Sequence, residues 1–201
     1  MNAALAMAES PAIQPDIRTQ DVRGRTVLVR ADLNVPMEGG RVTDPMRIVR
    51  FAPTVADLVR RGASVVVMSH LGRPGGVANP TLTLRPVAER LAAELGQRVI
   101  FVPDCVGAVA EQVTRTLPAG TVAMLENLRY HQEEERNDRS FALLLSVHGD
   151  FYVNDMPSPS GRSRQASIHA LPGLMPAFAG PLFLAAQRAV PSHPNDTLEE
   201  S

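Results

Sequence analysis

The sequence has 201 residues, of which 44% are hydrophobic, and its formal net charge at pH 7 is −1. These values are typical of a globular chain long enough to bury a core, and they argue against a basic nucleic-acid-binding surface. All 20 basic residues are arginine, so there is no lysine for a phosphate-binding P-loop or a Schiff base. Any phosphate held here by a basic side chain must be held mainly by arginine, which can bind it with two parallel hydrogen bonds.

The sequence shows no pattern typical of secretion, disulfide bonding or membrane insertion. A single cysteine, Cys105, cannot form an internal disulfide, which is typical of a reducing compartment. The stretch 1–10 lacks the basic start and long apolar run of a signal peptide. The longest uncharged apolar stretch, 171–186, is short for a membrane span and contains three prolines. We therefore expect a cytoplasmic protein that binds neither nucleic acid nor membrane, and we assign no metal ligands.

In chain order, the first predicted elements are a strand over 26–34 and a helix over 44–62. Asp44 can cap this helix, Pro45 suits its first turn, and Gly62 can end it. Five apolar residues fall near one face of the helix: Met46, Val49, Pro53, Ala56 and Val59.

Strands and helices continue to alternate along the rest of the chain. The next predicted elements are a strand over 63–70, a helix over 83–96, a strand over 99–104, a helix over 107–117, a strand over 121–127, a helix over 137–149 and a strand over 150–155. Such alternation predicts an α/β fold with a mainly parallel sheet flanked by helices, and the continuous apolar strands agree, since parallel strands are buried on both faces. We expect one α/β domain over 17–186, a flexible segment over 1–16, and a polar, disordered tail over 187–201.

Polar side chains follow four of the five predicted strands. In open parallel sheets, ligands bind beyond the carboxyl ends of the strands, where such side chains would meet at one edge. Several arginines converging from separate loops suit a phosphate or another polyanionic small molecule. The residues are Asp32 and Asn34 after the first strand, His70 and Arg73 after the second, Glu126, Asn127 and Arg129 after the fourth, and Asn154, Asp155, Arg162 and Arg164 after the fifth.

Each of these residues alone also has a simpler interpretation. Asp and Asn are common turn formers, and an isolated His70 is more often a hydrogen-bonded structural histidine than a ligand. Cys105 is more often a small buried residue than a reactive thiol. The acidic run 133–135 is typical of a solvated face. The repetition across four strands is what favours a binding site.

Five stretches of the sequence resemble the N-terminal half of phosphoglycerate kinase. They occur in the family's order and extend the resemblance from about residue 17 to about residue 183. The stretches are VLVRADLNVP (27–36), VVMSHLGRP (66–74), FVPDCVG (101–107), LENLRYHQEEERND (125–138) and YVND (152–155). The resemblance implies a Rossmann-like three-layer sandwich. It also implies a two-domain family that transfers a phosphoryl group between a nucleotide and 3-phosphoglycerate in glycolysis.

The resemblance also implies roles for individual residues. Asp32, Asn34 and His70 would contact the glycerate part of 3-phosphoglycerate, and Arg73 and Arg129 would bind its 3-phosphate. Arg47 would lie beside the substrate carboxyl group and neutralise charge on the phosphoryl group in transfer, as a catalytic residue. Such a reaction needs positioning and positive charge rather than a nucleophilic side chain.

The loop 156–167 departs from the family pattern. The family has a run close to AFGTAHRAHAS after its VND motif, whereas this sequence has MPSPSGRSRQAS, without either histidine and with two added prolines. Counting forward from the VND motif aligns Arg162 with the family arginine, and counting back from 176–180 shifts the register by one. We therefore choose Arg162 as the third phosphate-binding arginine, with Arg164 as the alternative.

The resemblance stops near the family's interdomain hinge. It leaves out the domain that binds Mg-ATP or Mg-ADP and the final family segment that packs on the N-terminal domain. We therefore expect a truncated chain that supplies the 3-phosphoglycerate-binding half of a kinase and is inactive alone, with a separate nucleotide-binding domain as its partner. A non-catalytic glycerate-phosphate-binding module and an inactive truncated paralogue remain alternatives.

Overall fold

The computed structural model describes residues 15–157 and 164–189, and its centre is a sheet of six parallel strands. The spatial order is β5-β6-β4-β1-β7-β8. The strands are β1 (Thr26–Arg30), β4 (Ser64–Met68), β5 (Val99–Val102), β6 (Val122–Leu125), β7 (Phe151–Asn154) and β8 (Ala177–Ala179). A separate antiparallel pair is formed by β2 (Met37–Glu38) and β3 (Arg41–Val42).

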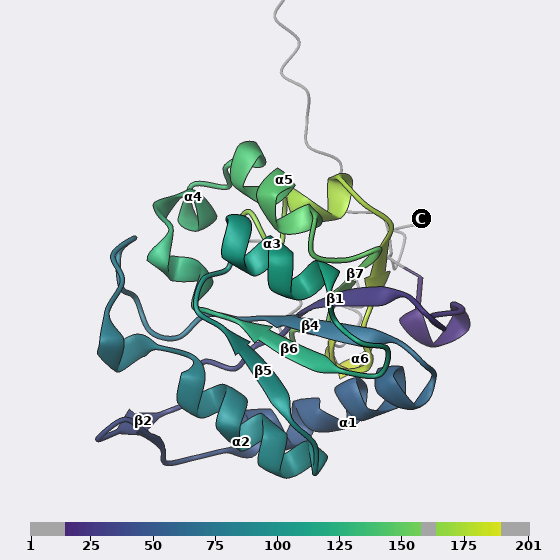
Figure 1. The fold of residues 1–201 in the computed structure, drawn as a ribbon, viewed down its shortest axis with the longest axis horizontal. Helices are drawn as coiled ribbons and strands as arrows, with labels where there is room; N and C mark the ends of the chain where they lie inside the picture. Colours follow the sequence, from purple (N-terminus) through teal and green to yellow (C-terminus); the bar gives the residue numbers. More distant parts are fainter. Residues whose placement is uncertain (1–14, 158–163, 190–201) are drawn as a thin grey trace, which may run out of the picture.

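Helices cover both faces of the sheet, which gives three layers (Figure 1). One face is covered by α1 (Met46–Arg60) and α2 (Arg85–Leu95). The other is covered by α3 (Ala108–Arg115), the short α4 (Gln132–Glu135) and α5 (Arg139–Ser146). The last described helix, α6 (Pro181–Ala189), follows β8, and short 3₁₀ turns cover Ile17–Thr19, Pro80–Leu82, Leu128–Tyr130 and Leu171–Gly173. The α/β class predicted from the sequence is confirmed.

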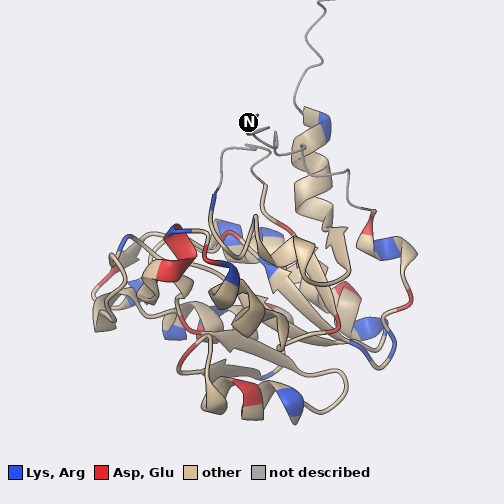
Figure 2. Cartoon of the chain, turned by 90° about the horizontal axis from the view of Figure 1, so that it is seen from above, with Lys and Arg blue, Asp and Glu red and all other residues tan. Residues whose placement is uncertain are grey.

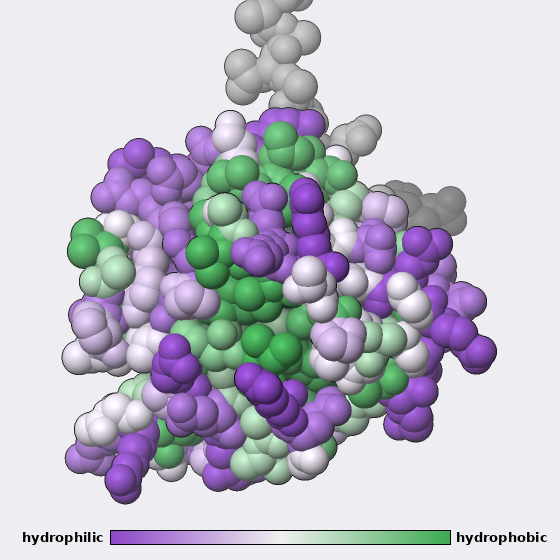
Figure 3. Space-filling view, viewed as in Figure 1, coloured by the Kyte–Doolittle hydropathy of each residue, from purple (hydrophilic) through white to green (hydrophobic). Residues whose placement is uncertain are grey.

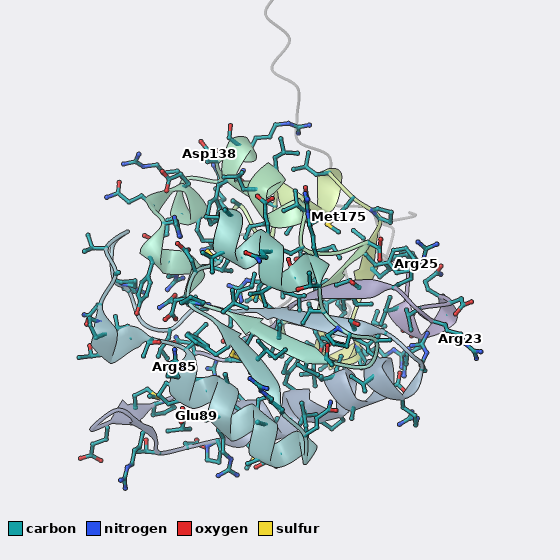
Figure 4. All side chains as sticks on the ribbon, in the orientation of Figure 1. Arg23, Arg25, Arg85, Glu89, Asp138 and Met175 are labelled. Atoms are coloured by element: carbon teal, nitrogen blue, oxygen red, sulfur yellow. The ribbon has the colours of Figure 1, made fainter. Side chains whose placement is uncertain are left out.

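Alternate residues of the central strands supply the two halves of the core. Val65 and Val67 of β4 face α1 and α2, whereas Val66 and Met68 face α3 and α5, and all four are fully buried. This two-sided burial explains why the strand has no polar alternation. Arg85, the first residue of α2, covers part of the edge strand β5 (Figure 4). Its guanidinium lies 4.4 Å from the centre of the ring of Phe101, a residue of β5.

The apolar face proposed for α1 is wrong. Met46 and Val49 are 50% and 38% exposed, and the helix instead buries a different set of residues: Ile48, Phe51, Ala52, Thr54, Val55 and Leu58. Apolar residues recur at helical spacing on both of these faces, and the sheet lies against the one with the larger side chains. The ends expected for this helix, 44 and 62, each lie two residues beyond the observed ends of α1. The Asp44 carboxylate accepts a hydrogen bond from the Met46 N–H, at the first residue of the helix.

The domain limits expected from the sequence stay a prediction, but both fall within segments that the structure describes. The backbone N–H of Ala179 donates to the carbonyl of Pro15, and Asp16 pairs with Ala179, so residues 15 and 16 join the sheet edge. At the other end α6 continues to Ala189, three residues past the expected boundary. Residues 1–14 and 190–201, where we expected flexible ends, lie outside the described residues.

The surface carries mixed charge with a band of apolar residues on one side. Acidic and basic residues are interspersed along the ribbon in Figure 2. On the face shown in Figure 3, apolar surface continues up to α5, where Leu143, Leu144 and Val147 are exposed. Among the described residues, no helix combines the length and hydropathy required to span a bilayer.

Candidate functional site

The four strands that carry polar residues at their carboxyl ends are neighbours in the sheet. They are β6, β4, β1 and β7, which form its centre, whereas the polar-poor strand β5 lies at the edge. All are parallel, so the loops that follow them emerge at the same edge of the sheet. The convergence expected from the sequence therefore follows from the strand order, and we call this edge the rim.

Asp32 and Arg47 form an ion pair at the rim. Asp32 follows β1 by two residues and its side chain is 16% exposed, whereas Arg47 is the second residue of α1 and is 49% exposed. The Arg47 guanidinium donates to Oδ2 of Asp32. The pair therefore joins the loop after β1 to the start of α1 and holds a half-exposed guanidinium beside the rim.

Asn34 and Arg129 hold the loop after β4 at a single glycine. Oδ1 of Asn34 accepts a hydrogen bond from the Gly72 N–H at 2.9 Å, and Nη1 of Arg129 donates to the Gly72 carbonyl at 2.8 Å. Gly72 has a φ of +62°, and a Cβ there would lie 2.8 Å from Cδ2 of Leu82. Only glycine fits this turn without displacing a side chain. Three loops thus meet at one backbone position.

The two arginines assigned to phosphate binding differ in exposure. Arg73 is exposed and forms no hydrogen bond or ion pair with any residue in the described parts of the chain. The Arg129 side chain is 15% exposed, and its Nε lies 3.6 Å from Oε1 of Glu135, which is too long for a hydrogen bond. This buried Nε has no hydrogen-bond partner among the described residues. Arg129 therefore retains one unsatisfied donor, which is buried beside Glu135.

His70 lies at the centre of these positive charges. It is 8% exposed, and its Nδ1 lies 3.0 Å from Nη2 of Arg30. Burial, together with the nearby positive charges of Arg30, Arg129 and Arg47, lowers the pKa of His70 to about 2. His70 is consequently neutral at physiological pH, and its surroundings favour a negatively charged ligand.

A buried polar chain behind His70 was missed by the sequence analysis. Arg30, the last residue of β1, is 1% exposed and donates from Nε to Oγ of Ser167 at 2.9 Å. Glu134 accepts hydrogen bonds from both the hydroxyl and the backbone N–H of Ser167, the latter at 2.9 Å. The expectation that 133–135 is a solvated face is wrong for Glu134, which is fully buried. The sequence offered one sign of this buried chain, namely Arg30, a charged residue at the end of an otherwise apolar strand.

Glu126 and Asn127 hold neighbouring loops rather than facing a ligand. Oε1 of Glu126 accepts a hydrogen bond from the Leu84 N–H at 2.8 Å, and Oε2 accepts one from the Thr83 hydroxyl. Nδ2 of Asn127 donates to the Leu71 carbonyl at 2.8 Å. Both side chains are buried and their polar atoms are occupied. For these two residues the turn-forming interpretation is the better one.

A family model described as phosphoglycerate kinase matches residues 17–193. The chain belongs to the phosphoglycerate kinase family. It is 51% identical over 162 residues to a phosphoglycerate kinase of Granulibacter bethesdensis, an alignment that covers 81% of this chain and 41% of that protein. It is 46% identical over 174 residues to one of Methylorubrum extorquens, covering 85% and 43%.

Solved structures of phosphoglycerate kinases share the fold. The enzyme from Coxiella burnetii matches with a TM-score of 0.78 and 29% identity over 88% of this chain and 44% of that one. The enzyme from Pyrococcus horikoshii OT3 matches with the same TM-score and 30% identity. The chain spans about two fifths of the length of the curated phosphoglycerate kinases that it matches.

The loop that departs from the phosphoglycerate kinase pattern is only partly described. Arg162, our choice for the third phosphate arginine, lies outside the described residues, as does the stretch 158–163. Arg164, the alternative, is exposed. Asn154 and Asp155, just before this loop, have local roles, since Oδ1 of Asn154 accepts from the Met156 N–H and Oδ1 of Asp155 accepts from the Leu182 N–H.

Among the described residues, one group of possible metal ligands lies where the loop after β5 meets the segment after β6. The ligand atoms of Asp104, Cys105 and His131 all lie within 4.8 Å of one another. Nε2 of His131 and Oδ1 of Asp104 are 2.8 Å apart and already share a hydrogen bond. Burial raises the pKa of the Cys105 thiol well above its usual range, which opposes the thiolate that binds metals. The hydrogen bond between Asp104 and His131 therefore joins the loop after β5 to the segment after β6, which accounts for the group without a metal ion.

Proposed function

We propose that the rim binds 3-phosphoglycerate and that the chain supplies the substrate-binding half of a phosphoglycerate kinase. Arg73 and Arg129 bind the 3-phosphate, with Arg162 as the third arginine. Asp32, Asn34 and His70 contact the glycerate part. Arg47 lies by the carboxyl group, where its charge would offset that of a phosphoryl group in transfer.

The observation that carries this proposal is the gathering of arginines from separate elements around His70 at the rim, which the lowered pKa of His70 reflects. Burial is the main cause of the lowered pKa, and three guanidiniums from separate elements, Arg30, Arg129 and Arg47, add to it. A buried site surrounded by guanidiniums selects an anion with several oxygens. The exposed guanidinium of Arg73 leaves donors available for a phosphate, and Arg129 lies in the neighbouring loop with an incompletely paired guanidinium.

We further propose that these 201 residues bind 3-phosphoglycerate without transferring phosphoryl groups on their own. The family acts with a nucleotide, and the sequence has no lysine to hold nucleotide phosphates. The nucleotide-binding residues would then belong to a separate domain, which the matched relatives are long enough to contain. The site would act on substrate once that domain closes over it.

The test is isothermal titration calorimetry of the chain with 3-phosphoglycerate, followed by a coupled assay with Mg-ATP. We expect binding that is weakened about ten- to hundredfold in Arg129→Ala, since hydrogen bonds to charged groups are worth about 1.5–3 kcal/mol. Arg23→Ala is the matched control, because Arg23 is an exposed arginine at the opposite end of β1 (Figure 4).

The two assays separate the possible functions. Binding without turnover, with turnover appearing when a nucleotide-binding domain of the family is added, supports the proposal. Binding without turnover even after that addition favours a non-catalytic binding module. The absence of any heat, or equal weakening by Arg23→Ala and Arg129→Ala, would contradict a substrate site at the rim. Turnover by the chain alone would contradict the need for a second domain.

A further inference from the structure

We propose that Arg30 is a positioning residue that holds His70 in a single tautomer, with the imidazole proton on Nε2. His70 then offers the rim a fixed N–H donor. This inference rests on the hydrogen-bonding capacity of the buried groups, so it can be true or false independently of which ligand the rim binds.

The tautomer follows from what a guanidinium can do. Arginine has five N–H donors and no acceptor, so Nη2 of Arg30, 3.0 Å from Nδ1 of His70, can only donate. Nδ1 must therefore accept with its lone pair. A neutral imidazole carries one ring proton, which is then on Nε2. The low pKa of His70 keeps the ring neutral, and the other charged groups that influence it, Arg129 and Arg47, are also positive.

Arg30 is itself fixed on three sides. Its Nη1 donates to the carbonyl of Ala31, its Nε donates to Oγ of Ser167 at 2.9 Å, and its Nη2 reaches His70. The guanidinium is planar and fully buried, so it cannot rotate without breaking one of these bonds. The contact with His70 is consequently set by the strand that carries Arg30.

Glu134 supplies the opposite charge that makes a buried arginine tolerable. It is fully buried, it raises the pKa of Arg30 against the lowering effect of burial, and it reaches Arg30 through the Ser167 hydroxyl. Hydrogen bonds thus connect His70 to Arg30, Arg30 to Ser167 and Ser167 to Glu134. Ser167, the last residue of the unusual loop 156–167, is part of this chain of contacts, so the end of the loop is connected to the ring of His70.

This arrangement has a chemical consequence for the rim. Nε2 of His70 forms no hydrogen bond with the described residues, so its proton is free for a ligand oxygen. A ring with so low a pKa cannot act as a general acid or base at neutral pH. His70 therefore selects an acceptor, such as a phosphate, carboxylate or hydroxyl oxygen, without adding charge to the site.

The test is nitrogen NMR of the imidazole rings in the full chain, which distinguishes protonated from unprotonated ring nitrogens. For His70 we expect a protonated Nε2 and an unprotonated Nδ1, unchanged between pH about 5 and 8. His148 is an internal control, because its Nε2 lies 3.0 Å from the Cys105 carbonyl, which can only accept. A protonated Nδ1 on His70, or a ring that titrates in this range, would overturn the inference.

The role of Arg30 is tested by a charge-balanced double substitution. Arg30→Met alone would leave Glu134 buried without its counter-charge, so it is combined with Glu134→Gln. In this variant we expect His70 to show both tautomers and a raised pKa, with His148 unchanged. A single Nε2–H tautomer that persists in the folded variant would show that Arg30 does not set it.

Titration with 3-phosphoglycerate separates this inference from the proposed function. We expect the double variant to bind about twofold more weakly, because the Nε2–H donor is then populated only about half of the time. If the wild-type chain shows the expected tautomer but no binding, the positioning role of Arg30 stands and the substrate assignment fails. Full-strength binding by a double variant with mixed tautomers would contradict the role of His70 as the donor.

Discussion

Replacing Asp155 by asparagine is expected to stabilise the protein at neutral pH. Asp155 follows β7 and is fully buried. Its Oδ1 accepts a hydrogen bond from the N–H of Leu182, near the start of α6, at 2.8 Å. Its Oδ2 is buried and forms no well-aligned hydrogen bond among the described residues, although the nearby Thr54 hydroxyl partly offsets the effect of burial on the pKa of the carboxyl group. Asparagine keeps the acceptor for the Leu182 N–H and removes a buried negative charge.

The size of the effect follows from the pKa of Asp155. Burial raises this pKa from 3.8 to about 6, and a change of about two pKa units corresponds to roughly 3 kcal/mol. Because the folded-state pKa lies above the unfolded one, the folded protein binds the proton more tightly. The stability contributed by the protonated carboxyl is present below pH about 4 and is lost as the pH rises to about 6. Asparagine does not titrate, so the variant avoids this loss.

The assay is urea unfolding of both proteins at several pH values. From pH about 4 to 8, the difference in unfolding free energy should change by roughly 2–3 kcal/mol in favour of the variant. An amide N–H with no acceptor costs about 1–2 kcal/mol at every pH, so the net gain at pH about 8 should be about 1 kcal/mol. Asp138→Asn is the control, because Asp138 caps α5 from a more exposed position (Figure 4) and asparagine caps equally well. A difference for Asp155→Asn that is constant across this pH range would refute the reasoning.

Two further predictions concern the packing of Gly180 against Asp155 and the burial of the Cys105 thiol. Gly180→Ala should lower the unfolding free energy by about 2–3 kcal/mol in urea denaturation, because its Cβ would lie 2.2 Å from Oδ1 of Asp155. Gly173→Ala, whose Cβ would meet no atom within 4 Å, should change it by less than about 0.5 kcal/mol, and equal effects would contradict the packing argument. The buried Cys105 thiol, with its raised pKa, should react with a thiol reagent only as the protein unfolds. Rapid labelling in the absence of denaturant would show that the thiol is accessible in the folded protein.

The sheet and the rim could be predicted because both depend on short-range patterns. The valine run 65–67 indicates a strand buried on both faces, and the rule for parallel sheets places the residues after it at a ligand-binding edge. The helix α6 and the three-residue strand β8 were missed, since 171–186 shows several prolines and no clear period. The buried face of α1 was misassigned, because both of its faces carry apolar residues and sequence does not say which one meets the sheet.

The contacts that shape the rim could not be predicted, because they join residues far apart in the sequence. Arg30 and Ser167 are separated by 137 residues, and Glu134 lies in an acidic run that resembles a solvated face. The one sign of these contacts in the sequence was Arg30, a charged residue at the end of an apolar strand. A buried charge needs a partner, so the presence of Arg30 required a carboxylate somewhere, although its position required the fold.

The positive charge of the rim is balanced unevenly, and this imbalance supports the proposal that the rim binds an anion. Arg47 is paired with Asp32, and Arg30 is joined to Glu134 through Ser167. Arg129 is only partly paired, because its Nε lies 3.6 Å from Oε1 of Glu135, too far for a hydrogen bond, and has no other partner among the described residues. Paired guanidiniums are held in place before any ligand arrives, whereas the partly paired one retains bonding capacity. A ligand with several anionic oxygens can therefore bind Arg129 without first breaking a buried ion pair, at little reorganisation cost.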